Sequence, residues 1–163
     1  MAIRPIITYP NEVLKKKALV VGTLKKEDQR LIRDLVDTMY QEDGVGIAAP
    51  QVGVSKRIIV VSPNAVRGEE RVFIDPEIIY ASKEEELGTE GCLSVPGISG
   101  EIRRSVSIRV KALDVKGKSF TEELSGFPAR VAQHEVDHLN GILLIDRLEF
   151  SQKQALMNSH QRL

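Results

Sequence analysis

Apolar residues recur every three or four positions between residues 25 and 41. The residues between them are polar or charged. This spacing is typical of an amphipathic helix that packs one face against a core. The apolar series consists of Leu31, Ile32, Leu35, Val36 and Met39.

Shorter periods predict strands in the middle of the chain. Apolar and polar residues alternate over 106–112, and the turn at 114–117 reverses the chain into 118–124, which predicts an antiparallel hairpin. Apolar or β-branched runs predict further strands at 57–62, near 71–74 and at 77–82. Because the strands come in runs, with helices before and after them, the predicted fold class is α+β with mostly antiparallel strands.

A second helix is predicted from Phe127-Pro128 to Asn140-Gly141, because proline is favoured at a helix start and glycine just after a helix end. At about 100° per residue, Phe127, Val131, His134 and His138 lie along one line, and small or apolar residues cover the opposite side. We therefore expect this helix to run through the core, with the predicted strands packed around it. The polar tail from Ser151 onward predicts a C-terminal helix.

Composition narrows the class of protein. A chain of 163 residues fits one domain, and Lys+Arg and Asp+Glu both total 23, so neither a nucleic-acid arm nor an anionic-membrane anchor is indicated. No apolar run reaches the ~20 residues of a membrane span, and the first residues lack the apolar core of a signal peptide. We expect a soluble cytosolic protein. Its one cysteine, Cys92, has no internal disulfide partner.

The predicted second helix carries the motif His134-Glu135-Val136-Asp137-His138. Histidines four residues apart on a helix can reach one metal ion, and the glutamate between them can act on water, so the motif fits a hydrolase. Two core histidines held by hydrogen bonds are the alternative. A catalytic metal site needs a third ligand, and Cys92 in its glycine-flanked bend is a better candidate than His160 in the polar tail.

A third segment, residues 44–51, is rich in small residues and ends at Gln51. Its G-x-G pair follows a helix and precedes a strand, the reverse of the dinucleotide-binding order, so we reject a dinucleotide site. The small residues would let backbone approach a ligand, and the Gln51 amide could donate to an oxyanion. An ordinary loop is the alternative.

Together, GVGIAAPQ at 44–51, EGCLS at 90–94 and QHEVDH at 133–138 resemble the three signature segments of peptide deformylases, in the family's order. The resemblance extends over nearly the whole chain and implies a single domain, 1–163, of the compact bacterial or organellar type. It implies a hydrolase that removes the N-formyl group from N-formylmethionyl nascent polypeptides and releases formate. The expected location is the bacterial cytoplasm or an organellar matrix.

The resemblance also assigns roles. Cys92, His134 and His138 would hold one divalent ion, with Fe²⁺ as the native ion and Zn²⁺ or Ni²⁺ as substitutes. Glu135 would be the general base for the metal-bound water that attacks the formyl carbon. Gln51 and the backbone N–H of Leu93 would stabilise the oxyanion. The expected substrate-binding residues are Val45, Gly46, Gly91, Phe127 and Val131.

The implied partners are formylated ends of nascent chains, with transient proximity to the ribosome, no direct nucleic-acid readout and no membrane. In one departure from the family's pattern, Ser99 stands where many members have arginine. Arg104 matches a family arginine, and we expect it to pair with Asp43. Two rival functions are a zinc peptidase, which needs a further His or Glu ligand, and a structural metal module, which needs four protein ligands.

Overall fold

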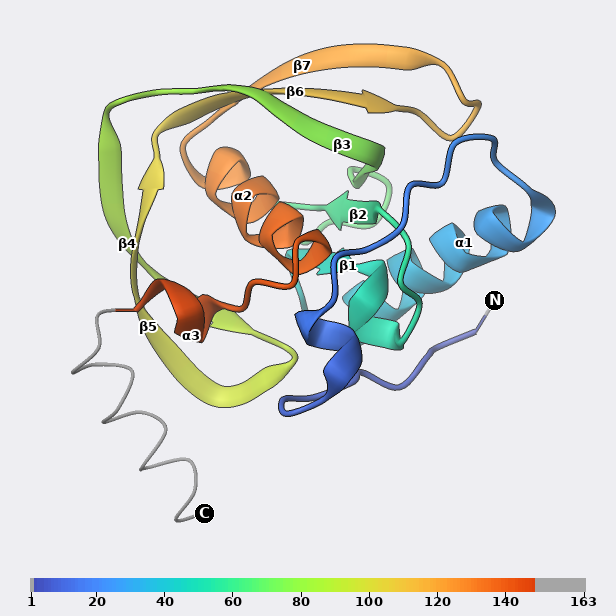
Figure 1. The fold of residues 1–163 in the computed structure, drawn as a ribbon, viewed down its shortest axis with the longest axis horizontal. Coiled ribbons are helices and arrows are strands. Elements are labelled where there is room, and N and C mark those ends of the chain that lie inside the picture. The colour runs from blue at the N-terminus through green and yellow to red at the C-terminus, as the bar shows by residue number, and fades with distance from the viewer. Residues whose placement is uncertain (1, 149–163) are drawn as a thin grey trace.

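The computed structural model describes residues 2–148, which form two antiparallel sheets and a set of helices (Figure 1). The larger sheet has five strands in the order β1-β2-β3-β6-β7, and the smaller is the hairpin β4-β5. The predicted α+β class with antiparallel strands is therefore confirmed. The elements are η1 (Glu12–Lys15), α1 (Lys26–Gln41), β1 (Gly46–Ala48), η2 (Ala49–Val52), β2 (Ile58–Val61), β3 (Arg71–Ala81), β4 (Glu85–Cys92), β5 (Val95–Ser105), β6 (Ser107–Leu113), β7 (Ser119–Ser125), α2 (Phe127–Leu139) and α3 (Leu144–Arg147).

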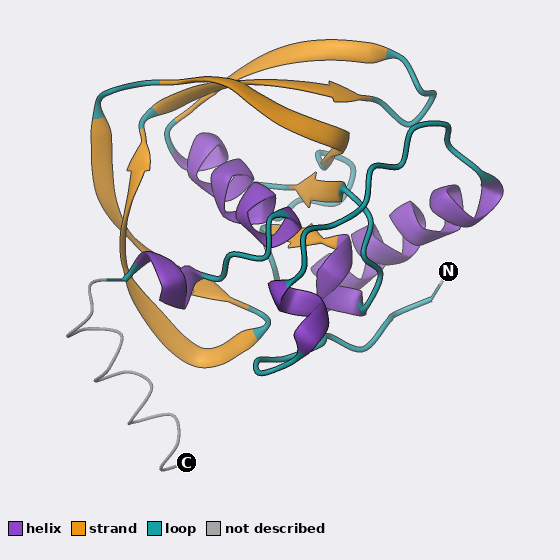
Figure 2. Ribbon diagram, in the orientation of Figure 1, coloured by secondary structure: helices purple, strands orange, loops and turns teal. Residues whose placement is uncertain are grey.

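Helix α2 lies inside the molecule. Figure 2 shows the strands curving round it on two sides. It packs against β1, β2, β5 and β7, and nearly every residue after its first turn is buried. Even the polar Gln133 is buried, because its side-chain amide exchanges hydrogen bonds with the backbone N–H and C=O of Ser105. A helix that is mostly apolar all round needs such an interior place.

Helix α1 occupies the segment where the sequence predicts an amphipathic helix. Leu31, Ile32, Leu35 and Met39 are buried, and the helix packs on β1 and β2. The helix therefore supports the sheet edge that is nearest to α2.

Strand β3 corrects one prediction. Residues 71–81 form one strand, not the two predicted strands on either side of Asp75-Pro76. The pairing register with β6 shifts between Ile74 and Glu77, and Asp75 has a φ of 51°. This irregularity in the pairing lets the strand continue through Asp75-Pro76. The Asp75 carboxylate also accepts hydrogen bonds from the backbone N–H groups of Val21 and Gly22.

The hairpin β4-β5 was not predicted at all. Strand β4 is charged and mostly exposed, and β5 begins at Val95 with Pro96 and Gly97 next in sequence. Inward positions of β5 do alternate, but glycine and arginine occupy two of them, so apolar periodicity is weak. The inward positions are Val95, Ile98, Gly100, Ile102 and Arg104.

The predicted C-terminal helix from Ser151 and the histidine His160 lie outside the described residues. Within residues 2–148, no helix is both long enough and apolar enough to cross a membrane.

The end of α2 is held by the N-terminal segment. The carbonyl of Leu139 accepts hydrogen bonds from Ala18 N–H at 2.8 Å and from Arg57 Nη1 at 2.9 Å. Gly141 follows with a φ of 74°, and a Cβ atom there would collide with the carbonyl of Lys15. Glycine is therefore required at this position by both backbone conformation and space.

We expect Gly141→Ala to destabilise the fold more than Gly117→Ala. Both positions have positive φ, which costs a non-glycine residue about 1–2 kcal/mol, but Gly117 has no atom within 4 Å of its added Cβ. The collision at Gly141 should add roughly 1–3 kcal/mol. The measurement is the free energy of unfolding in urea. Equal losses in the two variants would show that the contact with Lys15 relaxes without cost.

Candidate active site

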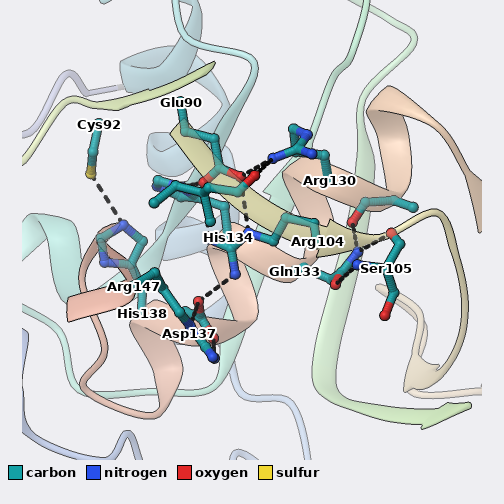
Figure 3. A network of polar contacts seen from close by, with 12 residues as sticks. Glu90, Cys92, Arg104, Ser105, Arg130, Gln133, His134, Asp137, His138 and Arg147 are labelled. Carbon is teal, nitrogen blue, oxygen red and sulfur yellow. Dashed lines mark hydrogen bonds and ion pairs between the residues drawn. The ribbon is translucent and has the colours of Figure 1, made fainter. Parts of the chain in front are cut away.

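Three side chains from two elements converge where the end of β4 meets α2. Cys92 ends β4, and His134 and His138 lie one turn apart on α2. One ligand atom from each lies within 4.8 Å of the other two, and Cys92 Sγ is 3.2 Å from His138 Nε2 (Figure 3). Within the described part of the chain, this is the one group of three or more His, Cys, Asp or Glu side chains close enough to hold a metal ion.

The two histidines differ in their protonation. Burial lowers the pKa of His138 well below its ordinary value, so its ring is neutral and keeps a lone pair. His134 Nδ1 lies 2.9 Å from Glu90 Oε1. Because Glu90 is ionised, Nδ1 carries the donated proton. Burial alone would lower the pKa of His134, but its hydrogen bonds with Cys92 and Glu90 outweigh burial and raise this pKa well above its ordinary value. A bound metal ion would therefore replace the proton on the other ring nitrogen.

Glu90 is the centre of a buried polar network (Figure 3). Its carboxylate accepts hydrogen bonds from Arg104 Nε and Nη2 at 2.9 Å and from Arg130 Nη1 at 2.7 Å, besides that from His134. Burial alone would raise the pKa of Glu90, but the hydrogen bonds and charges of Arg104 and His134 outweigh it and lower the pKa to about 2. Glu90 therefore stays charged inside the protein.

The contacts of Arg104 show that a second prediction was wrong. It does not pair with Asp43 at the surface; it is 5% exposed and bonds Glu90 and, at 2.6 Å, Asp137. Asp43 lies in the exposed turn after α1. A buried guanidinium requires partners that are buried with it, and two internal carboxylates meet that need.

Glu135 has one oxygen that lacks a partner among the described residues. The side chain is 4% exposed, and Oε1 is buried without a hydrogen bond. Burial is the main reason why the pKa of Glu135 rises to about 7. A Cβ atom on Gly46 would lie 2.6 Å from Glu135 Oε2, so glycine is what lets β1 approach α2 here. An unpartnered, proton-accepting oxygen beside three metal-ligand side chains fits a hydrolytic metal site.

The orientation of Gln51 is fixed by two contacts of its amide. Oε1 accepts the N–H of Ala48 at 2.9 Å, and Nε2 donates to Ser94 Oγ at 3.2 Å. Nε2 also lies 3.7 Å from Cys92 Sγ. The donor end of the amide therefore points to the metal-ligand side chains.

A cleft of about 750 Å³ opens over these residues, between the loop that precedes β1, the β4-β5 turn and α2. His138 is 1% exposed and lies behind the cleft, next to Cys92. The other residues predicted for the site all line it: Val45, Gly46, Gln51, Gly91, Cys92, Leu93, Phe127, Val131, His134 and Glu135.

Three charged residues that hold the site together were not predicted from the sequence. Glu90 is part of the EGCLS segment, and Arg130 and Asp137 belong to the polar stripe of α2, but their partners lie far away in sequence. The one available signal was the presence of charged residues on a helix expected in the core, since such charges need partners.

Comparisons with known proteins agree with this arrangement. The sequence profile of the polypeptide deformylase family matches residues 3–154. The peptide deformylase of Natranaerobius thermophilus is 46% identical over 151 residues, which cover 91% of this chain and 94% of that protein.

Solved structures show the same similarity. A peptide deformylase from Legionella pneumophila matches with a TM-score of 0.91 and 41% identity, covering 99% of this chain and 96% of that one. A class I type b peptide deformylase from Acinetobacter baumannii, solved with Met-Ala-Ser bound, matches with a TM-score of 0.85 and 39% identity, covering 90% and 100% of the two chains. The chain therefore belongs to the polypeptide deformylase family, metalloenzymes that remove formyl groups from the N-terminal methionine of polypeptides.

Proposed function

We propose that this chain hydrolyses the formamide of N-formylmethionyl polypeptides at a metal site formed by Cys92, His134 and His138. The observation that carries the proposal is the convergence of these ligands next to the unpartnered carboxylate oxygen of Glu135. A divalent ion held there would supply a Lewis acid for the formyl group and would lower the pKa of water. Membership of the family implies ferrous iron as the native ion, and a site of one thiolate and two imidazoles also accepts zinc or nickel.

Glu135 acts as the base in the proposed reaction. It takes a proton from the attacking water as the water oxygen bonds to the formyl carbon. The same proton then passes to the amine nitrogen as the carbon–nitrogen bond breaks, which yields formate and a free N-terminus. A pKa near 7 suits a group that must both accept and return a proton near neutral pH.

Gln51 and Leu93 stabilise the charge that develops on the formyl oxygen. The Gln51 amide is buried and already oriented, so it loses little freedom during the reaction. Leu93 follows Cys92 directly and lines the cleft, which supports its backbone N–H as the second donor. Loss of one such donor typically costs about 10²–10³ in rate.

The substrate backbone binds as an added strand. Strand β1 is at the edge of its sheet, and Val45 C=O already accepts Ser62 N–H at 2.7 Å. In an antiparallel ladder the next residue, Gly46, then turns its N–H and C=O away from β2. Gly91 provides the facing wall, where an added Cβ would meet one atom only, at 3.9 Å. Main-chain pairing of this kind tolerates varied sequences.

The first substrate side chain lies along α2, in an apolar slot formed by Phe127 and Val131 on the helical line of the histidines. The substrates in the cell are the ends of nascent chains, which places the enzyme near ribosomes in the bacterial cytoplasm or an organellar matrix.

Release of formate from formyl-Met-Ala-Ser, without cleavage of unblocked peptides, tests the activity. Cleavage of unblocked peptides would favour the peptidase alternative. Absence of both reactions would favour a structural metal site.

The metal prediction concerns ligand identity. We expect about one divalent ion per chain, bound through two nitrogens and one sulfur. X-ray absorption at the metal edge should show a sulfur scatterer near ~2.3 Å that is lost in Cys92→Ser. A wild-type spectrum without sulfur would remove Cys92 from the site.

The base prediction separates chemistry from metal binding. Glu135→Gln and Glu135→Ala should keep the metal yet lower kcat by at least the ~10²–10⁴ that general acid–base catalysis contributes. His134→Ala should instead lose the metal. The measurements are steady-state kinetics and metal analysis on the same preparations. Near-normal turnover of Glu135→Gln would overturn the assigned role.

The substrate prediction concerns the slot. Because a buried methylene contributes roughly 0.8 kcal/mol, formyl-Met peptides should exceed formyl-Ala peptides by about one to three orders of magnitude in kcat/KM. Val131→Asp should remove most of this preference by placing an unpaired charge in the slot. Equal kcat/KM for Met and Ala in the wild type would show that the slot does not lie along this face of α2.

A further inference from the structure

We propose that Arg130 is a specificity-determining residue that closes the far end of the slot for the first substrate side chain and limits its length. This inference rests on the proposed function, which places that side chain along α2. It assigns Arg130 a role beyond the apolar wall that Phe127 and Val131 form, because Arg130 lines the cleft where it meets a second hollow.

Arg130 stands between two hollows of the surface. It lines the main cleft and also a second hollow of about 210 Å³, and Phe127 is the one other residue that both hollows share. The second hollow is otherwise bounded by β4, the end of β5 and the start of α2, including Leu87 and Gly88. Arg130 and Phe127 are therefore the partition between the two spaces.

Of these two residues, Arg130 is the rigid one. Its Nη1 donates to Glu90 Oε2 at 2.7 Å and to Ile102 C=O at 2.9 Å, and its Nη2 donates to Glu86 C=O at 2.6 Å. Its side chain is 13% exposed, whereas Phe127 is 50% exposed. An arginine side chain is normally flexible, but acceptors on both strands of the hairpin fix this one in place.

Gly88 provides the room in which the guanidinium lies. A Cβ atom at Gly88 would be 2.8 Å from Arg130 Cζ. The guanidinium thus occupies the space that a side chain on β4 would otherwise fill. Figure 3 shows it reaching from α2 toward Glu90. The slot therefore ends on an arginine that belongs to the helix and is clamped to the hairpin.

The charge of this arginine is compensated, so it acts as a steric stop and not as an anion receptor. The Glu90 carboxylate faces the guanidinium, with Oε2 at 2.7 Å from Arg130 Nη1. A substrate side chain long enough to reach the guanidinium would have to displace a group held by a buried carboxylate and two backbone carbonyls. Such displacement is unfavourable because it would leave buried polar groups unpaired.

The test uses formyl-Xaa-Ala-Ser peptides in which Xaa is norleucine or 2-aminooctanoic acid, whose side chain is two methylenes longer. In the wild type, kcat/KM should fall for the longer side chain. Arg130→Ala should join the two hollows and raise the ratio of longer to shorter substrate by about tenfold or more, since each buried methylene contributes about fourfold. Arg130→Leu, which is smaller than arginine but preserves helix packing, should shift the ratio in the same direction.

Two matched controls separate the stop from general damage. Arg130→Lys keeps the methylene stem and should leave the ratio within about threefold of wild type. Leu87→Ala, which alters only the second hollow, should leave the ratio unchanged. Calorimetric binding of the deformylated peptides, norleucyl-Ala-Ser and 2-aminooctanoyl-Ala-Ser, to each metal-analysed variant should show the same change in preference without turnover.

Three outcomes would overturn this inference. The first is an unchanged ratio in both Arg130→Ala and Arg130→Leu with metal retained, and the second is a shifted ratio in Leu87→Ala. The third is efficient use of formyl-Glu-Ala-Ser by the wild type, which would mean that Arg130 binds anions. Absence of deformylation of formyl-norleucyl-Ala-Ser by the wild type would instead count against the proposed function itself.

Discussion

The buried carboxylate of Glu90 is the constraint on which the rest of the site depends. An ionised group inside a protein costs several kcal/mol unless it is paired and hydrogen-bonded. Here Arg104 comes from β5, whereas Arg130 and His134 come from α2. Compensating this one charge therefore fixes the hairpin against the helix. Cys92 lies two residues beyond Glu90 on β4, so the same contacts bring its sulfur to the two histidines.

The network continues from Arg104 through Asp137 to Arg147 on α3. Buried ion pairs of this kind often add little net stability, because desolvation offsets much of their attraction. Their effect here is geometric. The links from Glu90 to Arg130 and His134, and from Arg104 to Asp137, join the hairpin to a helix that is distant in sequence. An alternative packing of the hairpin on α2 would leave buried charges unpaired. The network thus favours the one arrangement in which β4, β5, α2 and α3 meet around the ligands.

Local periodicity decides which features could be predicted from sequence. Helices α1 and α2 and the hairpin β6-β7 coincide with predicted segments, because their patterns are complete within a few turns or strand residues. Most of the candidate site residues were predicted because three short motifs contain them, and Phe127 and Val131 were predicted because they share a helical line with the histidines. The hairpin β4-β5 was missed because charge and glycine mask its alternation. The partner predicted for Arg104 was wrong because its actual partners, Glu90 and Asp137, are brought next to it by the packing of the hairpin on α2. The local sequence around Arg104 does not indicate this packing.

The two walls of the cleft differ in kind, and in the proposed pose this difference would account for selective but sequence-tolerant binding. On the strand side, glycine predominates: Gly46 must be small because Glu135 and Val131 lie against it, and Gly91 leaves open space. Such a wall presents backbone groups, which are the same for every peptide. On the α2 side, fixed side chains define a slot. In the proposed pose, the enzyme therefore discriminates at the first residue of the substrate and is indifferent to most of the residues beyond it.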